Sequence, residues 1–341
     1  MDPLTPLIDV KSLRRYLAQH FPGADAPLEL ERISGGHSNE TFFVRRGPQE
    51  WVLRRPPRGP LLPTAHDVLR EYRILQALNM TSLPIPRVLL GCDDLTIIGA
   101  PFYLMERVPG VVIHDHLPAY GTDIPGRRAI SRALVDALVK LHQVDWRAVG
   151  LANLSKPDGY LERQIRRWTS QLERPRPRAL PELDHITAWL TAHIPVASPT
   201  TIVHGDYRFG NVIYATDEPR VAAIVDWEMA TLGDPLADLG ILLNSWREPG
   251  DQVSIIMAQL SPLAAQTGML TRAEIADYYA ECMGHPVHDL AFYQVLAQWK
   301  TAILLEGSYT RFMAGTTDDP FFGTLEQGIP QLAQQTLLLC Q

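Results

Sequence analysis

The pattern with the clearest chemical meaning runs from His204 to Asn211 (His-Gly-Asp-Tyr-Arg-Phe-Gly-Asn) and is followed by Asp226 in Val-Asp-Trp-Glu. Phosphoryl transfer to a hydroxyl needs one carboxylate to orient the attacking group. It also needs an Asn and a second carboxylate to hold magnesium at the nucleotide phosphates. Asp206, Asn211 and Asp226 have these types in this order. Asp and Asn are also common turn residues, but the whole pattern predicts kinase-type chemistry.

The segment between Asn211 and Asp226 is expected to form a β-hairpin. It contains two short apolar runs, at 212–214 and 221–225, which are separated by a turn at 216–219. Apolar, β-branched runs on either side of a turn that contains Asp and Pro are typical of a hairpin. This hairpin would return Asn211 and Asp226 to the same end, near Asp206.

The elements that position these residues change in type along the chain. Before Gly110, strand-like runs alternate with turn residues, at 28–33, 40–44, 50–54, 87–90 and 101–105. Helices are expected where apolar residues recur at helical spacing. These segments are 8–21 and 66–80, and after Gly110 they are 129–142, 160–172, 183–192, 273–283 and 290–312. We therefore expect an α+β fold with an N-terminal lobe over 1–107 and a mostly helical C-terminal lobe over 108–341.

Composition excludes several classes of protein. At 341 residues the chain exceeds the size at which a single core keeps growing, so two lobes are expected. The net charge of -7 gives no general attraction to nucleic acid or to anionic membranes. The three cysteines are too far apart for a disulfide framework or a zinc site, at Cys92, Cys282 and Cys340. No secretory signal or membrane-spanning run is visible, and a cytoplasmic location is expected.

A nucleotide site requires groups that contact phosphates, and the first lobe offers three. Gly35, Gly36 and Ser38 lie between two expected strands, where glycines would let backbone N–H groups approach phosphates closely. Arg54 ends the next strand, where a cation would contact the α- and β-phosphates. Glu71 on the following helix would hold that cation through an ion pair. Arg54 or Glu71 considered alone would be interpreted as a solvated surface residue.

The chain resembles the aminoglycoside phosphotransferase and choline-kinase-like family of the protein-kinase-like fold. Within it, the resemblance is closest to the phosphotransferase domains related to those fused to acyl-CoA dehydrogenases. It covers essentially the whole chain and rests on the motifs at 34–39, 51–55, 70–73, 103–110, 141–142, 204–211, 226–228 and 234–240. It implies a bilobal fold, with a small antiparallel-sheet N-lobe and a larger helical C-lobe, and it implies ATP and Mg²⁺ as cofactors.

The same resemblance implies roles for individual residues. Asp206 would be the catalytic base or the carboxylate that orients the substrate. Asn211 and Asp226 would be the magnesium ligands. Glu106 and Val108 would offer backbone groups to the adenine at the hinge between the lobes.

Supporting roles are also implied by the resemblance. Asp238 would brace the catalytic loop from a helix, and His204 would pack beneath that loop. One position departs from the pattern of protein kinases, because a lysine usually ends the third strand and this chain has Arg54 followed by Arg55. Arginine keeps the charge but spreads it over a planar fork, so the exchange is not neutral at a phosphate site. Which of the two arginines faces the nucleotide is left open by the sequence.

The acceptor site is expected in the helical lobe, and the charges there allow two interpretations. Six arginines and a single acid, Glu173, lie between 163 and 178: Arg163, Arg166, Arg167, Arg174, Arg176 and Arg178. They could form a solvated basic face, as charge runs usually do. They could instead bind an anionic substrate such as a phosphate-bearing acyl thioester, with Arg163, Arg167 and Lys300 as the contacts.

Three classes of function follow from these patterns. The first is a kinase that transfers the γ-phosphate of ATP to a hydroxyl of a small molecule, such as a hydroxyacyl-CoA or another anionic metabolite. An aminoglycoside or choline-like acceptor is the alternative within this class. The second is a catalytically silent kinase-like binding module, and the third is a metal-dependent phosphoesterase. No nucleic-acid or membrane partner is expected.

Overall fold

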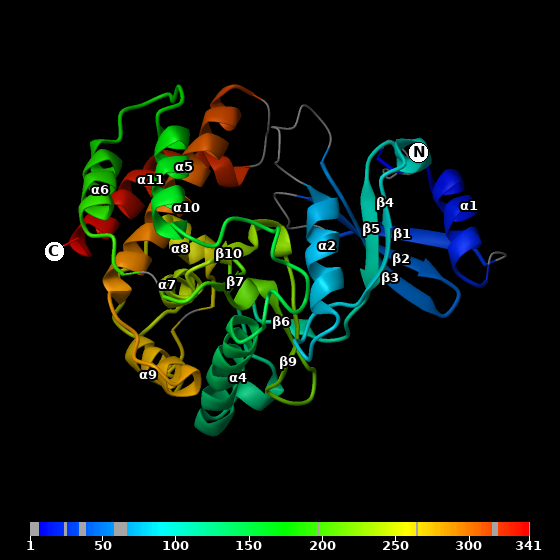
Figure 1. Ribbon diagram of the computed structural model, residues 1–341, viewed down its shortest axis with the longest axis horizontal. Coiled ribbons are helices and arrows are strands. Elements are labelled where there is room, and N and C mark those ends of the chain that lie inside the picture. The colour runs from blue at the N-terminus through cyan, green and yellow to red at the C-terminus, as the bar shows by residue number, and fades with distance from the viewer. Residues whose placement is uncertain are drawn as a thin grey trace. The chain divides into compact units, whose positions relative to one another are not determined.

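The structure is a computed structural model that describes residues 7–23, 26–33, 39–57, 67–196, 198–263, 265–315 and 320–340 (Figure 1). The chain divides into two units. Unit 1 comprises 1–109 together with 223–228, and unit 2 comprises 110–222 and 229–341. The first boundary lies two residues after the expected one at 107. The short stretch around Asp226 belongs to unit 1, although the chain on both sides of it belongs to unit 2.

The core of unit 1 is an antiparallel sheet of five strands in the order β1-β2-β3-β5-β4. The strands are β1 (Leu28–Arg32), β2 (Glu40–Arg46), β3 (Gln49–Arg55), β4 (Val88–Cys92) and β5 (Phe102–Glu106). Phe42 and Val44 on β2 are fully buried, with Leu53 and Leu104 on the neighbouring strands. The intervening residues of β2 are more exposed, as the alternation of side chains along a strand requires.

Helices cover both faces of this sheet (Figure 1). On one face α1 (Val10–His20) buries Leu13 and Leu17 against the strands, and the short helix α3 (Leu95–Ile98) contacts α1. On the other face α2 (Val68–Leu78) packs on β4 and β5. Asp67 caps α2 by accepting a hydrogen bond from the backbone N–H of Arg70, which satisfies one of the free donors at that end. Helix α2 therefore presents Glu71 to the sheet from a fixed position.

Unit 2 is mostly helical, and α10 (Leu290–Met313) is its central element. This helix is buried along most of its length and packs against α5, α6, α7 and α11. The other helices are α4 (Ile124–His142), α5 (Tyr160–Leu172), α6 (Pro181–Ala192), α7 (Leu236–Ser245), α8 (Ile255–Leu260), α9 (Arg272–Met283) and α11 (Pro320–Leu338). In the described part of the chain, no helix is long and apolar enough to cross a lipid bilayer.

Short strands in unit 2 hold the loop from His204 to Asn211 at both ends. Strand β7 (Thr201–Val203) pairs with β10 (Thr231–Gly233) and leads directly into His204. After Asn211 the chain enters β8 (Val212–Tyr214), which pairs with β6 (Val111–Val112) and is followed by β9 (Val221–Ile224). The predicted hairpin is thus confirmed, with its second strand ending one residue earlier than expected.

The helices and strands expected from the sequence are all present, with ends shifted by a few residues. The largest shift is in α4, which begins at Ile124 rather than at 129 because Asp123 caps it and Pro125 fits its first turn. The elements that sequence reasoning did not predict are α3, α8, α11, β6, β7 and β10, whereas α7 was expected only as the helix that carries Asp238. Most residues of α7 are buried, so it lacks the one-sided apolar pattern that marks a surface helix.

Candidate active site

The loop that carries Asp206 is fixed from below by one buried carboxylate. Asp238 on α7 is fully buried and accepts hydrogen bonds from two successive backbone N–H groups, those of His204 (2.6 Å) and Gly205 (2.7 Å). His142 on α4 lies 3.2 Å away through its Nε2. Burial alone would raise the pKa of Asp238, but the hydrogen bond and charge of His142 outweigh it and lower the pKa. The loop therefore rests on an ionised, fully paired anchor.

The conformation of the loop also depends on a glycine. Gly205 has φ of +86°, and a Cβ atom there would lie 2.8 Å from the carbonyl oxygen of Met229. Both the left-handed backbone and this close approach favour glycine. The ring of buried His204 lies beneath the loop, where its Nδ1 is 3.3 Å from the backbone N–H of Asp206. The positions of His204 and Asp238 under the loop are those that the sequence analysis expected.

Asp206 and Asn211 contact each other directly. The Nδ2 of Asn211 donates to the Oδ2 of Asp206 at 2.6 Å and to its backbone oxygen at 2.8 Å. A single 3-10 turn at Phe209–Asn211 brings the amide back to the carboxylate. The amide oxygen of Asn211 accepts no hydrogen bond from the residues that the structure describes. A carboxylate and a free amide oxygen are thus presented together.

Sequence reasoning did not include Arg208 among the site residues. Its Nε lies 3.3 and 3.4 Å from the two carboxylate oxygens of Asp206, and its Nη1 donates to the carbonyl of Leu260 at 3.0 Å. Gly210 leaves the space for this side chain, because a Cβ there would lie 2.7 Å from Nη1. The signal available in the sequence was a cation two residues after the proposed base, inside the same motif.

Unit 1 holds a second cluster around Arg54. Its Nη2 donates to the Oδ1 of Asp226 at 2.9 Å, and its Nε lies 3.4 Å from the Oε2 of Glu71. Arg54 is 8% and Glu71 1% exposed. Burial would lower the pKa of Arg54, but the charges of Glu71 and Asp226 raise it, so the guanidinium stays charged. Burial raises the pKa of Glu71. The ion pair expected between β3 and α2 is therefore present, and it extends to Asp226.

Asp226 has an unusual backbone conformation. Its φ is +68°, in the left-handed region that residues with a Cβ rarely adopt. The next residue, Trp227, is fully buried, and its backbone N–H donates to the Oε1 of Glu71 at 3.0 Å. These contacts hold the strained turn in place. The carboxylate of Asp226 is thereby directed at Arg54.

The two adjacent arginines of β3 point in different directions. Arg54 faces Glu71 and Asp226, whereas the guanidinium of Arg55 donates to the backbone carbonyls of Leu7 and Pro56. Successive side chains on a strand lie on opposite faces of the sheet, which separates them. Of the two, Arg54 is therefore the one beside the Asp226 carboxylate.

The structure describes only some of the other residues that were expected to bind the nucleotide. Gly35, Gly36 and Ser38 lie outside the described residues. Glu106 ends β5, where its backbone N–H donates to the carbonyl of Arg87 at 2.9 Å and its exposed carboxylate pairs with the side chain of Arg87. Val108 follows in the half-buried segment before β6.

Another residue that was not predicted stands beside the glycine segment. Asn39, directly before β2, is 7% exposed, and its Nδ2 donates to the Oε2 of Glu228 at 3.2 Å. The backbone oxygen of Glu228 lies 3.4 Å from the Nη1 of Arg70 on α2. Asn39 is thus hydrogen-bonded within unit 1 to the same turn that carries Asp226.

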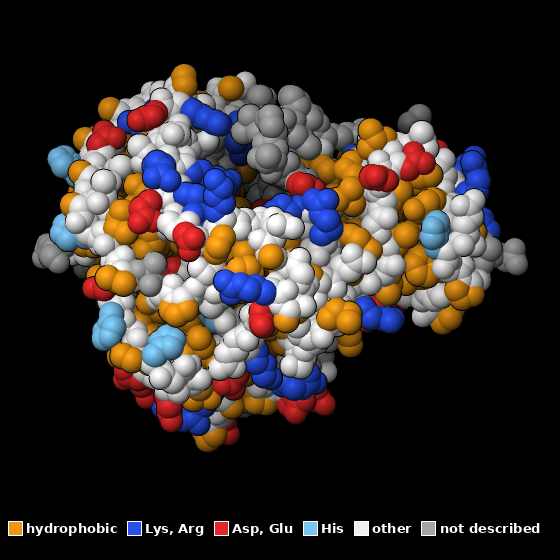
Figure 2. All heavy atoms as spheres, in the orientation of Figure 1, with side chains coloured by type: hydrophobic (Ala, Val, Ile, Leu, Met, Phe, Trp, Pro, Cys, Tyr) orange, Lys and Arg blue, Asp and Glu red, His pale blue; other side chains and the backbone are white. Residues whose placement is uncertain are grey.

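The arginines between 163 and 178 do not form a uniform basic face, although Figure 2 shows Lys and Arg side chains gathered over α5. Arg163 donates to the backbone carbonyls of Lys156 and Asp158, and Arg176 to that of Leu172 at 2.9 Å. Arg178 pairs with buried Glu306 on α10 at 2.7 Å. These three stabilise unit 2 itself. The other three are exposed, at Arg166, Arg167 and Arg174.

Lys300 on α10 lies near Asp206 and is half-buried. Its Nζ is 5.8 Å from the centre of the Trp168 ring, and the guanidinium of Arg167 is 5.7 Å from the same ring. The pKa of Lys300 is lowered to about 8, mainly by burial and also by the positive charge of Arg167. The negative charges of Asp238 and Asp206 oppose this shift. No hydrogen bond or ion pair joins its ammonium to the described residues. The ammonium of Lys300 thus interacts electrostatically with the carboxylates of Asp238 and Asp206 without contacting either as an ion pair.

Comparison with known proteins agrees with this arrangement. Residues 29–281 match the phosphotransferase enzyme family. Among curated proteins, the chain is 36% identical over 307 residues to acyl-CoA dehydrogenase family member 10 of Mus musculus, covering 89% of this chain and 28% of that protein. It is 32% identical over 339 residues to family member 11 of Homo sapiens, covering 96% of this chain and 43% of that protein. The chain spans less than half the length of these relatives.

Solved structures show the same fold. A protein of Ralstonia eutropha JMP134, described as a candidate aminoglycoside phosphotransferase, is 32% identical with a TM-score of 0.81, covering 98% of both chains. The aminoglycoside phosphotransferase APH(4)-Ia, in a complex with ADP and hygromycin B, has a TM-score of 0.61 at 16% identity, covering 96% of this chain and 98% of that one. The expected bilobal, protein-kinase-like α+β fold is confirmed. The chain therefore belongs to the phosphotransferase enzyme family and is a phosphotransferase that acts on an alcohol group.

Proposed function

We propose that the protein transfers the γ-phosphate of ATP to a hydroxyl group of a small anionic metabolite. The observation that carries this proposal is the position of Asp206, whose carboxylate is held by Asn211 at 2.6 Å on a loop anchored by Asp238. A carboxylate fixed in this way orients the acceptor hydroxyl and accepts its proton as the oxygen attacks phosphorus. The proton leaves the hydroxyl for Asp206, the new O–P bond forms, and ADP departs with the electrons of the bond that breaks.

The donor atoms fit magnesium. The amide oxygen of Asn211 is free of hydrogen bonds from the described residues, and Asp226 offers a carboxylate. Mg²⁺ prefers oxygen ligands and is usually held by one or two protein groups together with substrate phosphates and water. Bound there, the ion would neutralise charge on the phosphates. We assign Asn211 and Asp226 as its protein ligands.

Nucleotide binding is assigned to unit 1. Arg54 uses Nη2 for Asp226 and places Nε beside Glu71, while its Nη1 bonds to none of the described residues and suits a phosphate oxygen. Glu71 positions Arg54 and also fixes the backbone after Asp226. The backbones of Glu106 and Val108 are assigned to the adenine, and Gly35, Gly36 and Ser38 to the phosphates, as the family resemblance implies.

The acceptor is proposed to be anionic because the charges near Asp206 in unit 2 are positive. Lys300 and Arg167 lie on either side of Trp168, and the electrostatic interaction of Lys300 extends to Asp206. A polycationic acceptor would be repelled by these groups, whereas a carboxylate or phosphate would be attracted. Relatives named as acyl-CoA dehydrogenase family members make a hydroxyacyl-CoA one such acceptor. Arg163 stays a weaker assignment, because its guanidinium already binds backbone carbonyls.

An aminoglycoside is the second candidate acceptor. It is favoured by the likeness to the Ralstonia eutropha protein, which covers nearly the whole chain at 32% identity. It is disfavoured by the positive charges of Lys300 and Arg167, which would repel a polycationic acceptor. The cytoplasmic location expected from the spacing of the cysteines stays a prediction.

The test is an assay of phosphoryl transfer by the purified chain with Mg-ATP and separate acceptors. These are hydroxyacyl-CoAs, free hydroxy acids, choline-like alcohols, sugars and kanamycin-like aminoglycosides. We expect ADP release and a phosphorylated product, identified by mass spectrometry, only with an anionic acceptor, and none from Asp206→Ala. Efficient phosphorylation of the aminoglycoside would overturn the acceptor assignment. Mg-ATP binding with no transfer to any acceptor would favour a silent binding module.

A further inference from the structure

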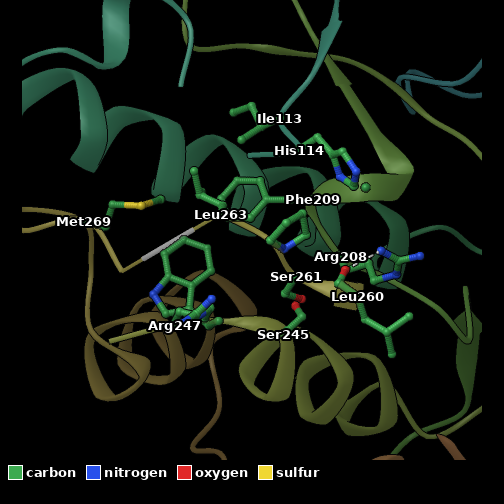
Figure 3. Close-up of a pocket in the computed structure, with 13 residues that line it drawn as sticks. Ile113, His114, Arg208, Phe209, Ser245, Arg247, Leu260, Ser261, Leu263 and Met269 are labelled. Carbon is green, nitrogen blue, oxygen red and sulfur yellow. Dashed lines mark hydrogen bonds between the residues drawn. The ribbon is translucent and has the colours of Figure 1, made fainter. Parts of the chain in front are cut away.

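A small pocket of unit 2 begins at Arg208, the same residue that contacts Asp206 (Figure 3). Its polar lining consists of Arg208, Arg247, His114, Ser245 and Ser261, and none of its thirteen lining residues is an Asp or a Glu. In Figure 3 the two serines are drawn between the two arginines. The space is about 20 Å³, enough for a group the size of one or two water molecules. The pocket is therefore small and carries positive charge.

Arg247 is the most unusual member of this lining. Its Nε is buried without a hydrogen-bond partner, and no ion pair joins Arg247 to the described residues. The nearby acids are already paired, since Arg272 lies 3.0 Å from Glu248 and also contacts Asp251. A buried guanidinium nitrogen that lacks a partner costs free energy, so such groups usually have a ligand or a functional role.

Arg208 also retains capacity to bind. Its contacts to Asp206 are long, at 3.3 and 3.4 Å, and its Nη1 is held at 3.0 Å by the carbonyl of Leu260 at the end of α8. Its Nη2 has no hydrogen bond to the described residues. Arg208 can therefore contact an anion in the pocket while remaining next to Asp206.

The other wall of the pocket is apolar and rigid. The rings of Phe209 and Trp246 are stacked with centroids 5.1 Å apart, and the Nε1 of Trp246 donates to the carbonyl of Leu270 at 2.7 Å. Leu260 and Leu263 complete this wall. Such a lining suits a short apolar chain that ends in a small anionic head.

We propose that this pocket is the subsite for the anionic head group of the acceptor, a carboxylate. It extends the proposed function by requiring an acceptor in which this head lies a short apolar chain away from the reacting hydroxyl at Asp206. Arg247 and Arg208 bind the head through charge-assisted hydrogen bonds, and the hydroxyl of Ser261 completes its shell, whereas the hydroxyl of Ser245 already donates to the carbonyl of Leu242 at 2.8 Å. Arg208 links the two ends of the acceptor because it contacts both the head and Asp206.

The test compares Arg247→Gln with Arg247→Lys, and with Arg166→Gln as a matched control on the exposed surface of α5. A hydroxy acid, its uncharged amide analogue and the corresponding hydroxyacyl-CoA serve as acceptors. For Arg247→Gln we expect the KM of the anionic acceptor to rise by roughly 10-fold or more, the loss of one charge-assisted bond. The lysine variant should recover part of this loss. The KM of the amide, the KM of ATP and acceptor-independent ATP hydrolysis should not change.

A second variant lowers the positive charge of the pocket without removing an arginine. Ser261→Asp should raise the KM of the same anionic acceptor at least as much, and its thermal midpoint is measured to show that it folds. An effect on the free acid that is absent for its amide identifies a carboxylate in the pocket, and an effect confined to the CoA ester would contradict the proposal. If the wild type phosphorylates anionic acceptors and both variants keep its KM for all of them, the pocket proposal is wrong and the kinase proposal stands.

If no acceptor is phosphorylated, a measurement of direct binding distinguishes the subsite proposal from the kinase proposal. Calorimetric titration of the hydroxy acid and of its uncharged amide into the wild type and Arg247→Gln requires no turnover. Binding that depends on Arg247, together with no transfer to any acceptor, would support the subsite and contradict the kinase proposal. Binding that is equal in both proteins would contradict the subsite whatever the turnover.

Discussion

Two arginine–carboxylate contacts, one in each unit, have the same chemistry and opposite surroundings. In unit 1, Arg54 is 8% exposed and lies 2.9 Å from Asp226 and 3.4 Å from the fully buried Glu71. In unit 2, Arg208 is partly exposed and lies 3.3 Å from Asp206. Buried pairs have few alternative partners, whereas a longer, solvated contact exchanges readily. The first pair is therefore part of the framework, and the second is a contact that an incoming ligand can replace.

The largest expected effect is on turnover at the exchangeable contact. Asp206→Ala should lower kcat by roughly 10²–10⁴, the usual loss for a positioned acid or base. The thermal midpoint should stay near that of the wild type, because the backbone of the loop is held by Asp238 rather than by the side chain of Asp206. Steady-state kinetics and calorimetry measure the two quantities. Unchanged turnover would remove Asp206 from the chemistry.

At the framework contact the main effect should be on stability. Glu71→Ala removes a buried partner of Arg54 and the acceptor for the backbone N–H of Trp227. Breaking a buried pair on one side typically costs about 3–5 kcal/mol in the free energy of unfolding. Urea denaturation measures this loss. Glu218→Ala, at the exposed pair with Arg220, is the control and should cost at most about 1 kcal/mol. Equal losses for both variants would contradict the contrast between buried and solvated pairs.

Asp226 belongs to the framework contact and is also proposed to hold the metal, so its removal should affect nucleotide binding. Asp226→Ala should weaken Mg-ATP binding by at least roughly 10-fold, as expected on losing a group that holds the metal. Extra magnesium should restore part of the affinity, and ATP binding without magnesium should change less. Isothermal titration at several magnesium concentrations makes this measurement. Wild-type affinity for Mg-ATP in this variant would show that Asp226 does not hold the metal.

The smallest expected effect depends on pH. The ammonium of Lys300 faces Asp206 from the loop, Asp238 from α7, and Arg167 and the ring of Trp168 from α5, and burial lowers its pKa to about 8. An anion binds the charged form, so the acceptor KM should rise a few-fold as pH rises through about 8. Lys300→Arg should flatten this rise because arginine stays charged. Kinetics between neutral and alkaline pH test this, and an identical rise in Lys300→Arg would assign it to another group.

Local sequence was enough to predict most of the longer helices and strands and the contact within the loop from His204 to Asn211. The strands of unit 1 alternate buried and exposed residues, and the contact between Asp206 and Asn211 follows from their spacing within a short turn. The ion pair of Arg54 with Glu71 was also predicted, because it joins consecutive elements of a known order.

Contacts between distant residues were not predicted, because no local pattern encodes them. The basic run near α5 is an example, since Arg178 finds its partner Glu306 far along the chain and is thereby removed from the surface. Arg208 was overlooked for a similar reason, as its second partner is the carbonyl of Leu260, which depends on where α8 ends. Counting charges in the sequence could not distinguish arginines that stabilise the fold from those available to a ligand.

The left-handed backbone at Asp226 has a consequence for how this site can change in evolution. With φ at +68°, the position favours a few residue types, chiefly Gly, Asn and Asp. Among the substitutions that preserve this backbone conformation, Asn keeps the shape of the Asp226 side chain and one of its oxygens but loses its negative charge. If Asp226 holds the metal as proposed, this substitution would remove that function while keeping the backbone conformation. It would also remove the charge that pairs with Arg54, so loss of function at this residue would be accompanied by a loss of stability.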